Sequence, residues 1–130
     1  KQQILIVDDS EMNREILTEM LQDDFRILEA ENGEEALKML KQYDTGISLM
    51  LLDIVMPVMN GYEATRQIRA LDRADAKTIP IIAMTANAFT EDRLKSKEAG
   101  MDEHITKPID SKLLVKVIAA LTGENAQRPK

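Results

Sequence analysis

Four apolar runs of the sequence each end in polar residues that can take part in chemistry. These residues are Asp8 with Asp9, Asp53, Thr85, and Lys107. The carboxyl ends of parallel strands lie along one edge of a sheet, and ligands bind there, so we expect these side chains to gather in one place. That edge would then carry three carboxylates, a hydroxyl and an ammonium.

The three carboxylates predict a metal site. Carboxylates held together repel one another, which costs stability unless a cation occupies the site. A small all-oxygen set with room for water suits Mg²⁺ better than zinc or copper, and the sequence has no Cys and one His to form a rival set. Helix capping by Asp9 or Ser10 is the alternative, but it does not explain Asp8 and Asp53. We therefore predict Mg²⁺ at Asp8, Asp9 and Asp53.

Lys107 and Thr85 complete a candidate site for phosphoryl transfer. Lys107 precedes Pro108, which keeps the backbone extended, and such X-Pro bonds adopt cis at a cost of only about 0.5–1 kcal/mol. Its ammonium can neutralise an anion, although a solvated loop lysine is the alternative. The Thr85 hydroxyl can donate to a phosphoryl oxygen. Aspartate can act as a nucleophile, and the transfer needs mainly positioning and charge neutralisation, so the set favours transfer to Asp53.

The elements that must position these residues are predicted as alternating strands and helices. Apolar runs alternate with helical patterns along the chain, which indicates βα units on a parallel sheet. The strands are expected near 3–8, 25–30, 48–53, 80–85 and 102–106. The helices are expected near 11–22, 33–43, 61–72, 91–99 and 110–122. The first, third and fourth strands are almost entirely apolar, which is typical of strands covered on both faces.

Capping residues and helical faces support this assignment. Asn32 with Glu35, and Asn60 with Glu63, have the spacing of an N-cap reinforced by a carboxylate. Further N-caps are predicted at Thr90 and Asp110, and helix-ending glycines at Gly100 and Gly123. In the first helix the apolar residues that share one face are Met12, Ile16, Leu17 and Met20. In the last helix the apolar residues at helical spacing are Leu113, Leu114, Val117, Ile118 and Leu121.

Length and charge limit the classes of function. The 130 residues predict one domain over residues 1–122 and a tail or linker stub over 123–130. A net charge of −6 argues against direct binding to nucleic acid or to an anionic membrane surface. The sequence lacks an apolar run of about 18 residues and a signal-peptide pattern, and it has no Cys, which fits a reducing cytoplasm. It begins at Lys1 rather than at an initiator methionine, so we expect a piece of a longer protein.

Several motifs in order carry a resemblance to a known family. They are residues 6–9 (IVDD), 51–57 (LLDIVMP) with 60–61 (NG), 84–86 (MTA) and 107–108 (KP). Over residues 2–122 the chain resembles the receiver domains of two-component response regulators and hybrid histidine kinases. The resemblance implies a flavodoxin-like, doubly wound sheet of five parallel strands in the order 2-1-3-4-5, flanked by five helices.

The resemblance also implies roles for the site residues. Asp53 would be the phosphoacceptor, taking a phosphoryl group from a histidine of a partner kinase or phosphotransfer domain. Asp8 and Asp9 would hold Mg²⁺ together with Asp53 and the backbone carbonyl of Val55. Lys107 would contact the phosphoryl oxygens. The isolated domain would not be an enzyme beyond the self-catalysed phosphorylation and dephosphorylation of its own aspartate.

Switching is implied at Thr85, which would also contact the phosphoryl oxygens and move towards them after phosphorylation. The family often has Tyr or Phe three positions before the site lysine, where this chain has His104. A half-exposed ring on an edge strand is the alternative to a switch role for His104. The responding face would be helix 91–99, strand 102–106 and helix 110–122, which also offers a surface for dimerisation. The residues expected to change exposure are Phe89, Met101, His104 and Ile109, while Val55 and Asn87 are expected to tune phosphate lifetime.

The sequence disfavours two rival functions and leaves two kinds of parent protein open. A haloacid-dehalogenase-like phosphohydrolase would need a second aspartate two residues after the nucleophile, where this chain has Val55. A receiver that has lost phosphorylation would lack an acidic residue or the lysine, and this chain has all of them. The parent is either a stand-alone regulator or a hybrid sensor kinase, which can be anchored in a membrane. His104 and the stretch 85–89 favour the hybrid kinase.

Overall fold

The described residues form a five-stranded parallel sheet in the order β2-β1-β3-β4-β5, as predicted. The computed structural model describes residues 2–43, 47–54, 59–71, 77–86 and 90–122. The strands are β1 (Gln3–Val7), β2 (Arg26–Ala30), β3 (Leu49–Asp53), β4 (Ile81–Thr85) and β5 (Glu103–Thr106). Each differs from its predicted range by one residue at one end.

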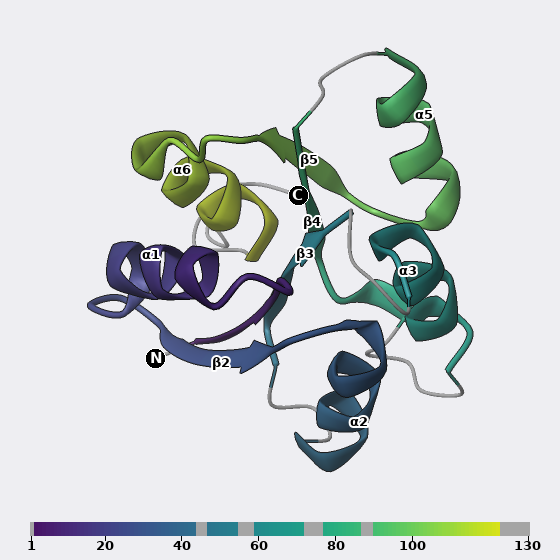
Figure 1. Cartoon of the computed structure of the whole chain (residues 1–130), viewed down its shortest axis with the longest axis horizontal. Coiled ribbons are helices and arrows are strands. Elements are labelled where there is room, and N and C mark those ends of the chain that lie inside the picture. Colours follow the sequence, from purple (N-terminus) through teal and green to yellow (C-terminus); the bar gives the residue numbers. More distant parts are fainter. Residues whose placement is uncertain (1, 44–46, 55–58, 72–76, 87–89, 123–130) are drawn as a thin grey trace, which may run out of the picture.

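Helices cover both faces of this sheet (Figure 1). The helices with described bounds are α1 (Glu11–Leu21), α2 (Gly33–Tyr43), α3 (Gly61–Arg69), α5 (Thr90–Ala99) and α6 (Ser111–Thr122). On one face α1 and α6 pack on a core that includes Ile4 and Leu51. The other face carries α2 and α3 over a core that includes Leu5 and Leu52, with α5 beside α3. This is the predicted doubly wound arrangement.

The central strands are buried on both faces, as their apolar sequences predicted. Residues 4–7 of β1 are fully buried, and all five residues of β3 and of β4 are buried. Because alternate side chains of a strand point to opposite faces, each of these strands contributes to both cores. The three strands therefore give the site at their ends a rigid base.

Predicted caps are confirmed at three helices. The Glu35 N–H donates to Asn32 Oδ1 at 2.8 Å, as expected of an N-cap, and Glu35 Oε1 accepts the N–H of Glu31, the residue before the N-cap, at 3.1 Å. Asn60 likewise caps α3, and Asp110 Oδ1 accepts the N–H of Lys112 at 2.9 Å at the start of α6.

Thr90, predicted as an N-cap, is the first residue of α5 instead. Gly100 has φ +107° after α5, whereas Gly123 lies outside the described residues.

Two predicted features of the helices differ from the structure. The predicted face of the first helix is only half buried: Leu17 is buried and Met20 packs against the same core, whereas Met12 is 69% exposed and Ile16 is 46% exposed. The buried face of α1 is Arg14, Leu17 and Leu21. The helix predicted over 61–72 ends at Arg69, where the N–H of Leu71 bonds the carbonyl three residues back and tightens the last turn.

The last helix follows its predicted face with one exception. Leu114 and Ile118 of α6 are fully buried, and Val117 and Leu121 are partly buried against the same core, whereas Leu113 is 48% exposed. None of the described helices is long and apolar enough to cross a membrane. Residues 123–130 lie outside the described residues, so the predicted tail and domain boundary stay predictions.

Candidate functional site

Strand register brings the predicted site residues to one edge of the sheet. Val7 pairs with Leu52, so Asp8 and Asp53 continue two neighbouring strands at the same level. Asp53 is in turn aligned with Met84, the residue before Thr85. The edge prediction made from the apolar runs is therefore confirmed for β1, β3 and β4.

The three predicted metal ligands lie together. Asp8, Asp9 and Asp53 each offer a carboxylate oxygen within 4.8 Å of the others. Asp8 is fully buried and Asp53 is 4% exposed, whereas Asp9 is exposed to solvent. Two carboxylates in a buried setting beside a third repel strongly, because little water screens them. The site therefore favours a bound cation.

Asp8 is held by the loop that leads into α1. Its Oδ1 accepts the backbone N–H of Ser10 at 2.9 Å, and its Oδ2 accepts from Asn13 Nδ2 at 3.5 Å. The Ser10 hydroxyl in turn caps α1 by accepting the N–H of Asn13 at 3.3 Å. Ser10 thus has the capping role raised as an alternative for this loop, while Asp8 and Asp9 keep carboxylate oxygens near Asp53.

Lys107 points its ammonium at the two buried carboxylates. Its Nζ lies 3.3 Å from Asp53 Oδ1 and 3.7 Å from Asp8 Oδ2. The backbone N–H of Lys107 donates to the Thr85 carbonyl at 2.7 Å, which fixes the lysine to the end of β4. The Lys107–Pro108 peptide bond is cis. Lys107 is therefore not the solvated loop lysine of the alternative reading.

Gly61 allows the first turn of α3 to lie directly against Asp53. A Cβ at Gly61 would stand 2.5 Å from the Asp53 carbonyl oxygen and 2.8 Å from Ile54 Cα, closer than real Cβ contacts. The Gly61 N–H also donates to the Ile54 carbonyl at 2.9 Å. Only a glycine fits here, so the Asn-Gly pair in the sequence has both a capping and a packing reason.

The donor set fits Mg²⁺. It consists of carboxylate oxygens, two of them buried, and Mg²⁺ prefers a few carboxylates plus water over an all-protein cage. Three carboxylates and one ammonium leave a formal charge of −2, which a divalent cation balances. Asp8, Asp9 and Asp53 are the side chains that would hold it. The predicted carbonyl ligand, Val55, lies outside the described residues.

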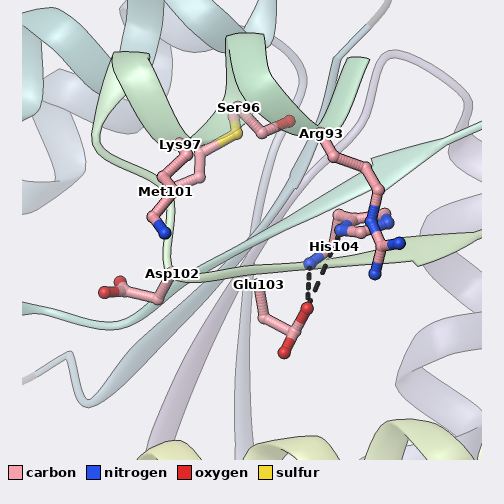
Figure 2. Close-up of a pocket in the computed structure, with 7 residues that line it drawn as sticks. All are labelled: Arg93, Ser96, Lys97, Met101, Asp102, Glu103 and His104. Atoms are coloured by element: carbon pink, nitrogen blue, oxygen red, sulfur yellow. Dashed lines mark hydrogen bonds and ion pairs between the residues drawn. The ribbon is translucent and has the colours of Figure 1, made fainter. Parts of the chain in front are cut away.

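Thr85 and His104 lie where the sequence placed them. Thr85 ends β4 and is buried, beside the carboxylate cluster in the sheet. His104 is on the edge strand β5, and its side chain is 13% exposed, less than the half-exposed ring of the alternative reading. Its Nδ1 lies 3.7 Å from Glu103 Oε1 (Figure 2). Asn87 and Phe89 lie outside the described residues.

Sequence reasoning missed Arg14. This arginine is 7% exposed and donates from Nη1 to the backbone carbonyl of Asp8 at 2.6 Å. The signal was available, since Arg14 shares a helical face with the apolar residues Leu17 and Leu21 at spacings of three and seven. A charged residue on the buried face of a helix implies a partner in the interior.

Comparison with known proteins gives a consistent family. The family model for the response regulator receiver domain matches residues 4–119. The chemotaxis protein CheY of Halobacterium salinarum is 42% identical over 118 residues, which cover 90% of this chain and 93% of that protein. Hybrid signal transduction histidine kinase I of Dictyostelium discoideum is 38% identical over 90% of this chain, but the match spans only 7% of that kinase.

Solved structures agree in fold. The receiver domain of a sensor histidine kinase from Pseudomonas aeruginosa has a TM-score of 0.84 and 32% identity, covering 94% of this chain and 98% of that one. That structure has a magnesium ion coordinated in its active-site cleft. Chemotaxis protein CheY4 of Vibrio cholerae has a TM-score of 0.85 and 27% identity, covering 92% of this chain and 98% of that one.

Proposed function

The chain belongs to the response regulator receiver domain family of two-component signalling, and on this basis we propose that Asp53 accepts a phosphoryl group from a phosphohistidine donor. The donor would be a histidine kinase or a histidine phosphotransfer domain, since relatives include hybrid histidine kinases. The chain spans a small part of those kinases, so their kinase activity is not transferred to it.

In the proposed reaction a carboxylate oxygen of Asp53 attacks phosphorus. A bond forms between that oxygen and phosphorus while the bond from phosphorus to the imidazole nitrogen of the donor breaks, and its electron pair stays on the nitrogen. Asp53 sits at the end of the rigid strand β3, with Gly61 against its carbonyl, so its position is fixed before the donor arrives. Water later hydrolyses the aspartyl phosphate.

Charge neutralisation is the main contribution of the surrounding residues. Bound Mg²⁺ would supply positive charge at the phosphoryl oxygens, and Asp8 and Asp9 would hold it beside Asp53. The magnesium ion in the related Pseudomonas receiver supports this assignment. Lys107 Nζ would exchange its contact with Asp53 Oδ1 for a phosphoryl oxygen, and the Thr85 hydroxyl would donate to another.

One observation carries the proposal: Lys107 Nζ lies within 3.7 Å of both buried carboxylates, next to a third carboxylate. An ion pair that only stabilised the fold would need one carboxylate for one ammonium, but three carboxylates lie together beside the Lys107 ammonium. Such an excess of negative charge at a buried strand edge is expected where a metal cation and a phosphoryl group bind together.

The proposed response is a shift of the face formed by α5, β5 and α6, which would control a partner or a linked domain. A cavity of about 260 Å³ lies between α5 and β5, and Figure 2 shows its lining: Arg93, Ser96, Lys97, Met101, Asp102, Glu103 and His104. Lys107 follows β5 directly and its N–H is bonded to Thr85, so movement of Thr85 reaches this strand. The same face is the proposed surface for dimerisation.

The proposed cellular location and the absence of nucleic-acid binding rest on the phosphoryl donor and on the net charge. A phosphohistidine donor is made from ATP, which places the module in the cytoplasm, even if a parent kinase is anchored in a membrane. The net charge of −6 opposes direct binding to nucleic acid. A linked or partner protein would carry any output of that kind.

The direct test is the intact mass after incubation with acetyl phosphate, with and without Mg²⁺, for wild type and Asp53→Asn. The expected result is a Mg²⁺-dependent gain of one phosphoryl group in the wild type and none in the variant. A gain of the same size in Asp53→Asn would show that another residue accepts the group.

A further inference from the structure

A buried arginine ties the loop with the metal ligands to the sheet. Arg14 lies one turn into α1, and its side chain is 9% exposed. Its Nη1 donates to the Asp8 carbonyl at 2.6 Å, and its Nε donates to Glu29 Oε1 at 2.9 Å. Glu29 belongs to β2. The guanidinium therefore joins α1, the end of β1 and β2 at one point.

The Asp8 carbonyl belongs to the peptide that orients Asp9. The Asp8 N–H still pairs with the sheet, donating to the Ala30 carbonyl at 3.1 Å. Successive side chains of an extended strand point to opposite faces, so the carboxylates of Asp8 and Asp9 converge only if the chain turns between them. The peptide that joins these two residues is the pivot of that turn, and Arg14 holds its oxygen.

We infer that Arg14 is a positioning residue for the metal site: by holding the Asp8 carbonyl, it fixes the direction in which Asp9 leaves the strand. The inference rests on the proposed Mg²⁺-dependent function and adds to it the residue that keeps the ligand pair in place without a metal. The loop has a second restraint in the Ser10 N–H bond to Asp8 Oδ1, which orients the carboxylate of Asp8 but not the carboxylate of Asp9.

The chemistry of the contact requires arginine. The two bonds use two nitrogens of one planar group, and a lysine has a single nitrogen that cannot reproduce this fork. The Glu29 side chain is 41% exposed, so it stays hydrated when the guanidinium is removed. An Arg14 variant should therefore keep the fold, because it leaves no buried unpaired charge.

Whether Mg²⁺ affinity falls or rises when Arg14 is removed distinguishes a positioning role from a purely electrostatic one. If Arg14 acted only through its positive charge, its removal would strengthen binding of a cation. If Arg14 holds the ligands in place, its removal weakens binding, because the ligands must be ordered when the metal binds. Substitution of groups that orient metal ligands costs about tenfold to a hundredfold in affinity, and we expect about tenfold for Arg14→Met.

The test is calorimetric titration of the folded protein with Mg²⁺. Arg14→Met should bind Mg²⁺ about tenfold more weakly than wild type, and Arg14→Lys should also bind more weakly although its charge is kept. The matched control is Arg66→Met, which removes an arginine that is 56% exposed and pairs with Glu63 on α3. Phosphorylation by acetyl phosphate should slow at limiting Mg²⁺ and return to the wild-type rate at saturating Mg²⁺.

Each outcome has one meaning. Unchanged or stronger Mg²⁺ binding by Arg14→Met, beside normal binding by wild type, would overturn the positioning role and leave the proposed function intact. Absence of Mg²⁺ binding by wild type would overturn the proposed function, and this inference with it. If Arg14→Met does not fold, Arg14→Lys and Glu29→Ala decide, and unchanged affinity in both would overturn the inference.

Discussion

At the scale of single residues, Lys107 has two opposed effects on the site. Its ammonium lies 3.3 Å from Asp53, so it competes with a metal for the carboxylates, yet it also neutralises an incoming phosphoryl group. We predict that Lys107→Met binds Mg²⁺ more tightly and is phosphorylated about a hundredfold more slowly, the cost of removing one charge-stabilising donor. Titration calorimetry and the rate of mass gain with acetyl phosphate measure the two effects.

The matched control is Lys112→Met, which removes an exposed lysine at the start of α6. Its phosphorylation rate and Mg²⁺ affinity should equal those of wild type. A Lys107→Met variant that is phosphorylated at the wild-type rate would show that the ammonium serves the fold rather than the transfer.

Substitution of Asp9 tests whether the three carboxylates repel one another when no cation is bound. Asp9 is exposed, and its carboxylate lies near two buried carboxylates. We predict that Asp9→Asn raises the free energy of unfolding without Mg²⁺ by about 0.5 kcal/mol, because one repulsive charge is removed. The stabilisation by Mg²⁺, about 2.7 kcal/mol at a hundredfold excess over Kd, should shrink strongly in this variant.

Urea unfolding with and without Mg²⁺ gives both quantities. Asp23→Asn removes an exposed carboxylate beyond the end of α1 and is the control for net charge. A loss of stability in Asp9→Asn without Mg²⁺ would contradict the picture of mutual repulsion.

Single residues were predictable from sequence where their neighbours in the chain are apolar. Asp8 and Asp53 follow apolar runs and could be placed at strand ends from them, whereas Lys107 follows the mixed stretch 103–106 and was indicated by the proline after it. Arg14 was missed, because an arginine inside a helix usually lies in solvent. Its shared face with Leu17 and Leu21 was visible in the sequence, but its partner Glu29 was not, since the pairing of residues fifteen positions apart is set by tertiary structure.

At the scale of elements, the approach of α3 to the end of β3 sets the position of Asp53. We predict that Gly61→Ala lowers the free energy of unfolding by about 1–3 kcal/mol, since the added methyl meets the backbone of Asp53 and Ile54, which cannot move aside. Phosphorylation should slow as Asp53 shifts. Chemical unfolding and the rate of mass gain measure these effects.

Gly33→Ala is the graded control. A Cβ there meets Met59 Sδ at 2.8 Å, which can move aside, and Ala64 Cβ at 2.9 Å on α3, which cannot. Gly33→Ala should therefore also destabilise the fold, but with little effect on the phosphorylation rate, because its contacts do not include Asp53. Equal slowing of phosphorylation by the two substitutions would argue against a special role for the contact between Gly61 and Asp53.

The positions of the strands and helices were predicted from the sequence more accurately than the buried face of α1. Strands buried on both faces are nearly all apolar, so β1, β3 and β4 were evident. The predicted face of α1 was right for Leu17 and Met20 but not for Met12 and Ile16, because the exposed side of the helix also carries apolar residues. Hydrophobic periodicity assumes that exposed positions are polar, and this assumption fails on that surface.

At the scale of the whole molecule, we predict that phosphorylation changes the face formed by α5, β5 and α6. Loading Asp53 with a phosphoryl mimic such as beryllofluoride should change amide hydrogen exchange on β5 and α5. The reason is that Lys107, which follows β5, donates a backbone hydrogen bond to Thr85, so a shift of Thr85 is transmitted to β5. Exchange in α2, on a different edge of the molecule, should stay constant and serves as the internal control (Figure 1). Identical exchange on β5 and α5 with and without the mimic would contradict the switch.

The overall topology was predictable because strand order follows from the family resemblance and the alternation of elements. The cavity between α5 and β5 was not, since its walls come from packing between a helix and an edge strand. The 13% exposure of the His104 side chain belongs to the same packing, so its burial could not be read from one residue and its neighbours.

The chemical location of the phosphoryl group decides whether Asp53 is the phosphoacceptor. Wild-type protein phosphorylated with acetyl phosphate and Mg²⁺ is reduced with borohydride, which converts an aspartyl phosphate to homoserine, and is then mapped by peptide mass spectrometry. We predict homoserine at position 53 alone. Homoserine at position 8 or 9, or a phosphoryl group that survives reduction on another type of side chain, would contradict it.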